Sequence, residues 1–180
     1  MDEQFFARDA VTVAADLLGV FLLVDGIGGI IVETEAYRRD DAASHSYRGP
    51  TRSNAAMFGA PARAYVYRSY GLHWCLNFVC ETGRAVLIRA LEPTEGLEAM
   101  VARRAGAPVR RLCAGPGNLC RALAVTGDMN GLSLFAPPFV LQPSSAAPIV
   151  ASGARIGISK AVERPWRFAV PGSSCLSKPI

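Results

Sequence analysis

The stretch VFLLVDGIGGIIVETEAY, residues 20–37, carries the strongest structural signal in the sequence. An apolar run over residues 20–24 ends at Asp25-Gly26, a dipeptide typical of tight turns, and a second apolar run follows. The pattern predicts a β-hairpin whose second strand enters the core and continues to residue 37. Because side chains alternate along a strand, we expect Glu33, Glu35 and Tyr37 on one face, and Val32, Thr34 and Ala36 on the other.

The sequence around this hairpin predicts further strands and helices. A helix is expected over residues 9–19, with Asp9 as its N-cap. The other expected elements are two strands within residues 64–79 that join near residues 69–71, a strand at 85–90, a helix over 92–105 with Pro93 in its first turn, a short helix opening at 115–118, and short strands near 132–135, 155–158 and 166–170. Residues 38–63 show no periodicity and are expected to form a long loop. This order predicts one α+β domain over residues 1–180, with a mostly antiparallel sheet flanked by helices.

The composition fits a single folded domain. The chain has 180 residues, 51% of them hydrophobic and 19% charged, without an apolar run of the roughly 18 residues that would span a bilayer. The acidic start Met1-Asp2-Glu3 does not resemble a signal peptide, so we expect a soluble, cytoplasmic protein without a membrane partner. Five cysteines without a Cys-x-x-Cys pair are expected to be core thiols. Neither histidine has a partner at metal-ligand spacing, so we expect no metal site.

The net charge of +4 is unevenly distributed along the chain. Residues 1–35 contain one arginine against seven carboxylates and carry −6, so the remaining residues carry +10. Almost all of these cations are arginines, because Lys160 and Lys178 are the only lysines. Arginine suits phosphate binding, so the composition is consistent with a nucleic-acid partner. A basic, solvated surface without such a partner is the alternative.

Residues that could carry chemistry gather in one window of the sequence. All five tyrosines and both histidines lie within residues 37–73. Glu33 and Glu35, two residues apart beside a tyrosine, could hold a water-activating base, or they could be exposed acids that form salt bridges. His45, in the predicted loop, could be a ligand, a base or a capping residue. Gly115-Pro116-Gly117 could point backbone N–H groups at a phosphate, but it lacks the ending of a P-loop.

Eight motifs follow one another along nearly the whole chain. They are IVETEAY at 31–37, HSYRG at 45–49, MFG at 57–59, YVYRSYGLHWCLN at 65–77, LIRALEP at 87–93, GPGNLC at 115–120, ARIGI at 154–158 and RPWRF at 164–168. With these motifs the sequence resembles the 3-methyladenine (alkyladenine) DNA glycosylase family. The resemblance implies one mixed domain around a curved, mostly antiparallel sheet. It also implies hydrolysis of the N-glycosidic bond of alkylated or deaminated purines in double-stranded DNA.

The resemblance further assigns roles to individual residues. Glu35 is the base that activates water, and Arg89 helps to hold that water. Tyr37, His45 and Tyr67 surround the damaged base, which is flipped out of the duplex. Asn77 lies on the pocket floor, where it obstructs the guanine amino group, and for Glu33 we expect a structural role. The residues expected to contact DNA are Tyr70, which fills the vacated stack as a wedge, and Leu72, His73, Thr51, Arg52, Gly117 and Asn118.

The scarcity of lysine adds a prediction about the reaction. A glycosylase that also nicks the strand needs an amine to form a Schiff base, and Lys160 and Lys178 lie far along the chain from the motif residues. We therefore predict a monofunctional enzyme that leaves an abasic site. Separately, we expect no cofactor and a monomer. A catalytically inactive nucleic-acid-binding module of the same fold and a small-molecule hydrolase with a carboxylate pair are the alternatives.

Overall fold

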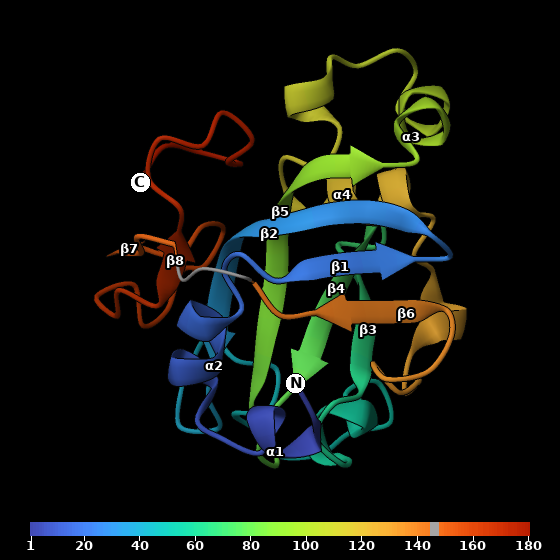
Figure 1. Ribbon diagram of the computed structural model, residues 1–180. Helices are drawn as coiled ribbons and strands as arrows, with labels where there is room; N and C mark the ends of the chain where they lie inside the picture. Colours follow the sequence, from blue (N-terminus) through green and yellow to red (C-terminus); the bar gives the residue numbers. More distant parts are fainter. Residues whose placement is uncertain (145–147) are drawn as a thin grey trace.

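The computed structural model describes residues 1–144 and 148–180, which are arranged around an antiparallel sheet (Figure 1). Neighbouring strands follow the order β3-β4-β5-β2-β1-β6, and β8 joins this sheet through β2 and pairs with β7. Every pairing between these strands is antiparallel. The strands are β1 Phe21–Val24, β2 Ile27–Tyr37, β3 Ala64–Ser69, β4 His73–Val79, β5 Ala85–Glu95, β6 Phe139–Gln142, β7 Ala151–Gly153 and β8 Arg167–Ala169.

β2 is the centre of the sheet, because neighbours pair with both of its edges. β5 pairs along one edge, while the other edge pairs first with β1 over residues 27–30 and then with β8 over residues 33–35. The register between β2 and β5 shifts on either side of Glu33, which marks β-bulges. Bulges bend a strand and redirect its side chains, and Figure 1 shows β2 and β5 curving across the molecule.

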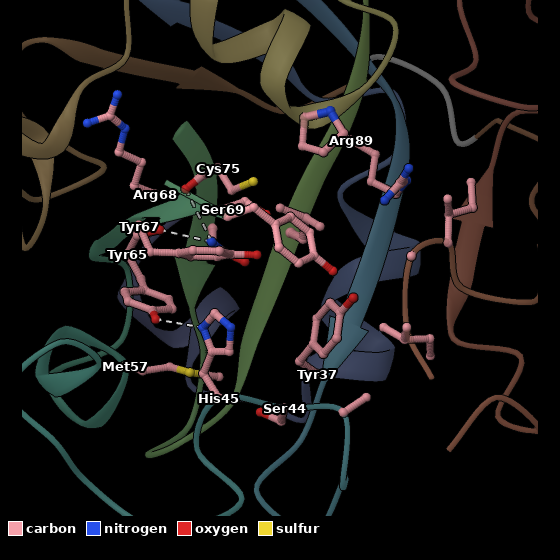
Figure 2. Close-up of a pocket in the computed structure, with 18 of the residues that line it drawn as sticks. Tyr37, Ser44, His45, Met57, Tyr65, Tyr67, Arg68, Ser69, Cys75 and Arg89 are labelled. Carbon is pink, nitrogen blue, oxygen red and sulfur yellow. Dashed lines mark hydrogen bonds between the residues drawn. The ribbon is translucent and has the colours of Figure 1, made fainter. Parts of the chain in front are cut away.

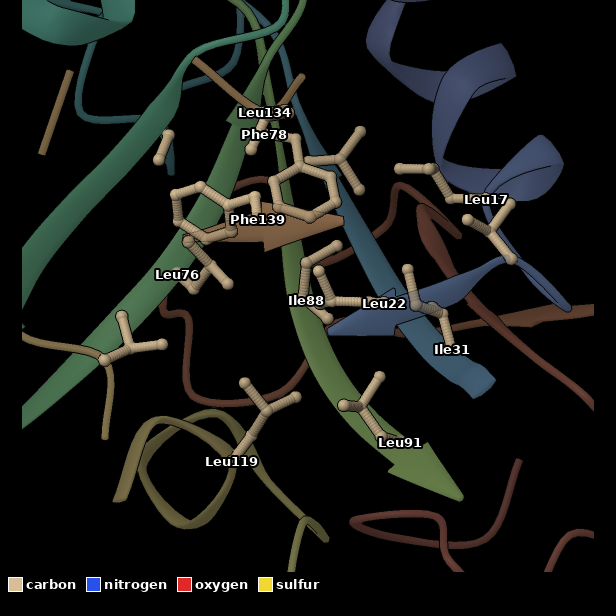
Figure 3. Close-up of a cluster of buried hydrophobic side chains, with 14 of the residues drawn as sticks. Leu17, Leu22, Ile31, Leu76, Phe78, Ile88, Leu91, Leu119, Leu134 and Phe139 are labelled. Atoms are coloured by element: carbon tan, nitrogen blue, oxygen red, sulfur yellow. The ribbon is translucent and has the colours of Figure 1, made fainter. Parts of the chain in front are cut away.

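Helices cover the core of the sheet. The α-helices are α1 Glu3–Phe6, α2 Ala10–Asp16, α3 Leu97–Arg103 and α4 Pro116–Leu123, and the 3₁₀ turns are η1 Ala55–Phe58, η2 Val109–Arg111 and η3 Gly127–Met129. Leu17, just after α2, and Leu119 of α4 share one buried cluster with Phe78 and Ile88 of the sheet (Figure 3). Each such side chain contributes about 1.5–3 kcal/mol when it is fully buried. This cluster fixes the sheet from which the site is built.

The strongest local patterns are confirmed by the structure. The hairpin of residues 20–37 is β1–β2, the two strands within residues 64–79 are β3 and β4, and the strand near residues 166–170 is β8. The helix expected over residues 9–19 is the shorter α2, and its N-cap Asp9 accepts a hydrogen bond from the backbone N–H of Val11. The α+β class is confirmed, and all five cysteines are buried, free thiols, as expected.

The helix predicted over residues 92–105 is wrong in its first part. β5 continues to Glu95 with Pro93 inside it, and α3 begins only after Gly96, whose φ is 70°. Gly29 of β2 has no side chain, so β5 can pair closely with β2 at this point. A Cβ added to Gly29 would lie 2.0 Å from the carbonyl oxygen of Glu92. The edge of β2 therefore overrides the local helical pattern.

The weakest strand predictions are also wrong. Residues 132–135 form no strand, and Ser133 makes an isolated bridge with Arg63. Residues 155–158 form a loop that turns at Gly157 (φ 77°), while β6 and β7 lie outside both predicted segments. β6 forms because β1 offers it an unpaired edge, which a local pattern cannot reveal. Among the described residues, no helix is long and apolar enough to cross a membrane.

Candidate active site

Alternation along the strands separates a core face of the sheet from a face that carries a pocket. Leu76 of β4 and Ile88 of β5 point into the main core, whereas their neighbours Cys75 and Arg89 line the pocket. The pocket has a volume of about 650 Å³, which is in the range of small-ligand sites. Residues 42–45 and 156–160 complete its lining (Figure 2).

Glu35 is fully buried and is not itself among the residues that line this pocket, but its carboxylate contacts three residues that are. Its Oε2 accepts a hydrogen bond from the Tyr37 hydroxyl at 2.8 Å, and its Oε1 accepts one from the backbone N–H of Ile156 at 2.7 Å. Nη1 of Arg89 lies 3.2 Å from the same Oε1. These three partners line the pocket, and Glu35 lies directly behind them. The alternative of exposed acids on a strand face is wrong, because Glu33 is fully buried as well.

The surroundings of Glu35 make its carboxylate a better proton acceptor. Burial raises the pKa of Glu35 above its ordinary value of 4.5, and the nearby charge of Glu33 adds to this. The Arg89 charge and the hydrogen bonds from Ile156 and Tyr37 offset part of the rise. A carboxyl group with a raised pKa in a pocket wall is suited to general base catalysis.

Glu33 has the opposite environment. Its carboxylate accepts hydrogen bonds from Nε of Arg89 at 2.9 Å, from Nε of Arg167 at 2.8 Å, and from the backbone N–H and the hydroxyl of Ser177, both at 2.6 Å. Burial alone would raise the pKa of Glu33, but the Ser177 and Arg167 hydrogen bonds and the Arg89 charge together lower it. Glu33 therefore stays ionised and anchors Arg89, in keeping with the structural role expected for it.

The bulges in β2 modify the predicted alternation. Val32 does not share a face with Ala36: Val32 packs against Ala90 and Cys175 in a separate cluster, whereas Ala36 belongs to the main core. A bulge places an extra residue between the regular pairs and so changes the direction of the side chains that follow. This irregularity lies next to Glu33, at the point where Arg89 comes between the two carboxylates.

Arg155 holds the segment that carries Ile156 against β2. Its guanidinium pairs with the buried carboxylate of Asp41 and donates to the carbonyl of Ala36 at 3.0 Å. The same guanidinium lies 4.8 Å from the ring centre of Tyr37. Arg155 thereby fixes the two groups, the Ile156 N–H and the Tyr37 hydroxyl, that bind the carboxylate of Glu35.

Aromatic rings form the part of the pocket that is open to a ligand. Figure 2 shows Tyr37, His45 and Tyr67 around a common space. The ring centres of His45 and Tyr67 are 4.4 Å apart, and Nδ1 of His45 lies 2.9 Å from the hydroxyl of Tyr65. Partial desolvation of its ring lowers the pKa of His45 below its ordinary value of 6.5, which favours the uncharged imidazole. Electron-rich rings beside a neutral imidazole suit a flat, cationic ligand.

Asn77 is fixed on the pocket side of β4. Its side-chain Nδ2 donates to the backbone carbonyls of Tyr65 at 3.0 Å and Cys75 at 3.4 Å, so the amide cannot easily turn aside. The pocket therefore has a rigid polar group in its lining. The structure thus brings together the six residues that the resemblance placed around the base and the water: Glu35, Arg89, Tyr37, His45, Tyr67 and Asn77.

The turn between β3 and β4 presents two large apolar side chains to solvent. Tyr70 is 86% exposed and Leu72 is 74% exposed. The N–H of Leu72 donates to the carbonyl of Ser69 at 2.9 Å, and both central residues have positive φ, 49° at Tyr70 and 68° at Gly71. These φ values are typical of a type I′ turn, which a tyrosine adopts at a cost. A strained aromatic residue at an exposed tip is a candidate contact for a partner.

The start of α4 lies beside this hairpin. A Cβ on Gly117 would be 2.9 Å from the ring of His73, so the glycine permits close packing of α4 against the first residue of β4. Nδ2 of Asn118 donates to the carbonyl of Ala114 at 2.8 Å, so its amide stabilises the loop before the helix. Pro116 and His73 both line the pocket, which places this corner at its rim.

A second pocket of about 540 Å³ shares a wall with the first. Its lining includes three cations, Arg48, Arg68 and Lys160, together with Thr51. The ion pairs of the described residues involve other arginines: Arg8, Arg38, Arg84, Arg89, Arg155, Arg164 and Arg167. Arg52 is exposed beside Thr51 and is not among the residues that line the two pockets. The second pocket is therefore a basic extension of the first.

Three groups near the site were not predicted from the sequence. The backbone N–H of Ile156 belongs to the ARIGI motif, to which no role had been assigned. Ser177 meets Glu33 across 144 residues of chain, and no sequence pattern indicates this contact. Lys160 lines both pockets, so its distance along the chain does not separate it from the site, and that part of the monofunctional argument is wrong.

Comparison with known proteins identifies the class to which this fold and site belong. The sequence model of the family described as Methylpurine-DNA glycosylase (MPG) matches residues 4–174, and the chain belongs to this family. The protein is therefore a hydrolase that acts on N-glycosyl bonds. The family resemblance inferred from the sequence motifs is confirmed.

Individual relatives are similar over almost their whole length. A protein of Rhizobium etli named "Putative 3-methyladenine DNA glycosylase" is 59% identical over 176 residues, which cover 98% of this chain and 88% of the relative. Proteins of the same name from Rhizobium meliloti and Nitrosospira multiformis are 58% and 55% identical, covering 98% and 97% of this chain and 96% and 92% of the relatives.

Proposed function

We propose that this protein removes alkylated purines, 3-methyladenine above all, from double-stranded DNA by hydrolysing the N-glycosidic bond. The observation that carries the proposal is the buried carboxylate of Glu35, held beside Arg89 at the wall of a pocket lined with aromatic rings. The names of the relatives support this substrate. Hypoxanthine and ethenoadenine are further candidate substrates. The enzyme acts as a monomer on cytoplasmic DNA in this proposal.

The damaged base is recognised after it has been flipped out of the duplex. An alkylated purine carries a positive charge, and each tyrosine face attracts a desolvated cation by about 0.5–2 kcal/mol. Tyr37 and Tyr67 supply such faces, and the uncharged His45 does not repel the cation. The fixed amide of Asn77 obstructs the exocyclic amino group of guanine, which favours adenine-type bases.

Hydrolysis uses Glu35 and Arg89. Glu35 accepts a proton from a water molecule, and the water oxygen forms the new bond to C1′ of the sugar. The bond from C1′ to the purine nitrogen breaks, and its electron pair leaves with the base, whose positive charge is thereby neutralised. The carboxylate also stabilises the positive charge that develops on the sugar. A carboxylate oxygen accepts two hydrogen bonds, so Oε2 can bind water in addition to Tyr37.

In this proposal the duplex lies across the tip of the β3–β4 hairpin and the second pocket. Tyr70 enters the stack that the flipped nucleotide leaves, and the cations of the second pocket bind neighbouring phosphates. The proposed DNA contacts are Tyr70, Leu72 and His73 at the hairpin, Gly117 and Asn118 at α4, and Thr51, Arg52, Arg48, Arg68 and Lys160 around the second pocket.

The enzyme leaves an abasic site without cutting the strand in this proposal. Lysines that form Schiff bases are activated by desolvation, whereas Lys160 is exposed at the pocket rim. Borohydride should therefore trap no covalent adduct between the protein and abasic DNA. A trapped adduct that disappears in Lys160→Gln would contradict this prediction.

The decisive experiment is base release from a duplex with one alkylated purine, under single-turnover conditions, by wild type and Glu35→Gln. Glutamine keeps the shape, and its amide can still accept from Ile156 and donate to the Tyr37 oxygen. We expect at least about a hundredfold slower release, because general base catalysis is lost. The exposed Glu98→Gln is the matched control. Release by Glu35→Gln at the wild-type rate would overturn the proposed base, and binding without excision by wild type would favour the inactive module.

A further inference from the structure

Ser177 makes contacts that the proposed reaction does not explain. Its hydroxyl donates to Oε1 of Glu33 at 2.6 Å and accepts a hydrogen bond from Nη2 of Arg89 at 3.1 Å. Its backbone N–H donates to Oε2 of Glu33 at 2.6 Å. A single residue from the end of the chain therefore binds both members of the buried ion pair beside Glu35.

These contacts give each of the three nitrogens of the Arg89 guanidinium a partner. Nε faces Glu33 at 2.9 Å, Nη2 faces Ser177, and Nη1 faces Glu35 at 3.2 Å. Because the guanidinium is planar, fixing Nε and Nη2 also fixes the direction in which Nη1 points. The orientation of Arg89 toward Glu35 thus depends on Glu33 and Ser177 together.

The segment that carries Ser177 is itself fastened to the sheet. Arg167 of β8 binds Glu33 through Nε and the carbonyls of Lys178 and Pro179 through its other nitrogens, the latter at 3.2 Å. Cys175 is buried against Val32 and Ala90. The residues matched by the family model end at 174, so this segment lies beyond them.

We infer that Ser177 is a positioning residue, which the segment 175–180 holds against Glu33 so that Arg89 keeps Nη1 on the carboxylate of Glu35. The inference rests on the proposed role of Glu35 as base. Ser177 touches no reacting atom and acts through Arg89. Segment 175–180 thereby supports the proposed active site.

Loss of the Ser177 hydroxyl should change the titration of Glu35. The charged or titratable groups around Glu35 are Glu33 and Tyr37 on β2, Tyr67 on β3, Cys75 on β4 and Arg89 on β5, with Arg155 behind Tyr37. Of these, Arg89 is the cation in direct contact, and it lowers the pKa of Glu35. If Arg89 turns away, the pKa of Glu35 rises further, and ionised Glu35 is lost at a higher pH.

The test compares wild type, Ser177→Ala and Ser177→Thr in single-turnover release of an alkylated purine at saturating enzyme, from pH 5 to pH 9. For Ser177→Ala we expect about a tenfold lower rate at neutral pH, because the hydroxyl's hydrogen bonds to Glu33 and Arg89 are lost and Arg89 is no longer held toward Glu35. We also expect the acid limb of the pH profile to move up by about half a unit or more, with unchanged affinity for the duplex. Ser177→Thr should retain both the rate and the profile.

Matched variants separate positioning from general destabilisation. Ser174→Ala removes an exposed hydroxyl from the residue just before this segment and should behave as wild type, because this hydroxyl contacts neither Glu33 nor Arg89 in the described residues. If Ser177→Ala does not fold, Ser177→Thr and Ser177→Val replace it as a pair of equal shape that differs in the hydroxyl. Rates are expressed per folded molecule from the native circular dichroism signal.

The outcomes distinguish this inference from the proposal on which it rests. A wild-type rate and pH profile in Ser177→Ala, with Glu35→Gln inactive, would overturn the positioning role alone. A lower rate with an unchanged pH profile would also overturn it, because a merely structural defect does not move the acid limb. Full activity of Glu35→Gln would instead overturn the proposed base.

Discussion

Glu33 and Glu35 are separated by one residue on β2, and their pKa values move in opposite directions. Glu33 receives hydrogen bonds from two arginines and from Ser177, while Glu35 shares Arg89 and otherwise receives a hydroxyl and a backbone N–H. Environments that separate the pKa values of neighbouring carboxyl groups often divide their roles. Here one carboxylate anchors a cation and the other is left as a base.

The pH dependence of the free energy of unfolding should reflect the opposite pKa shifts of Glu33 and Glu35. The pKa of Glu35 is raised above 4.5 in the folded protein, so the folded state binds more protons than the unfolded state as the pH rises from about 4.5 through the raised pKa. Wild type therefore loses stability in that window, and Glu35→Gln does not. We expect the unfolding temperature of Glu35→Gln, relative to wild type, to increase with pH in thermal melts from pH 4 to pH 8.

Glu33→Gln is the matched comparison, with the thermal melts extended below pH 4 because the pH window of Glu33 lies below 4.5. The pKa of Glu33 is lowered, so its carboxylate stabilises the fold above the ordinary value of 4.5, and this stability is lost as the pH falls toward the lowered pKa. Glu33→Gln should therefore become less stable relative to wild type as the pH rises to about 4.5. A pH-independent difference in either variant would contradict the assigned environments.

The site residues could be predicted only in part at this scale. The family motifs led to Glu35, Arg89 and the aromatic residues, which do meet at one pocket. The contacts of Ser177 and Ile156 with the two carboxylates join residues 144 and 121 positions apart. Such contacts arise from the path of the folded chain, and one sequence carries no local pattern for them.

The elements of the fold differ in how strongly local sequence determines them. The β1–β2 hairpin has a turn dipeptide between two apolar runs and was predicted with nearly its observed bounds. β5 was predicted too short, because its last residues, including Pro93, are held in the sheet by the glycines of β2. β6 was missed because it forms by pairing with β1, which lies more than a hundred residues earlier in the chain.

The exposed Tyr70 at the tip of the β3–β4 hairpin leads to a prediction about base flipping. Base stacking on an aromatic side chain contributes about 1–3 kcal/mol, so Tyr70→Ala should lower the flipped population in duplex DNA by about tenfold or more. The measurement is single-turnover release of the same damaged base from a duplex and from a single strand. We expect a large loss on the duplex and a small one on the single strand, which has no stack to fill.

The fold should not be weakened by this change, because Tyr70 is 86% exposed and alanine meets a similar strain at this positive φ. Val109→Ala, at a 48% exposed residue of η2, is a control for loss of exposed apolar surface. Equal losses on duplex and single strand would show that Tyr70 acts in the pocket rather than as a wedge.

At the scale of the whole molecule, two groups of arginines have different surroundings. Several arginines neutralise carboxylates inside the protein, among them Arg89, Arg155 and Arg167, each of which is buried. These cations are paired inside the protein and are not free to bind the phosphates of the duplex. The composition pointed to phosphate without separating the two groups, because ion pairing is visible only in the folded chain.

The cations that line the second pocket, Arg48, Arg68 and Lys160, are the group that we expect to release counterions from DNA. Each phosphate contact contributes about 0.9 to the slope of log K against log salt concentration. Arg48→Gln and Lys160→Gln should therefore each reduce this slope by about one unit. The measurement is duplex affinity, determined by fluorescence anisotropy between about 50 and 200 mM salt. Arg110→Gln, an exposed arginine of η2, should leave the slope unchanged. Equal slopes for wild type and both pocket variants would place the DNA backbone elsewhere, since a cation that meets a phosphate must reduce the number of ions released.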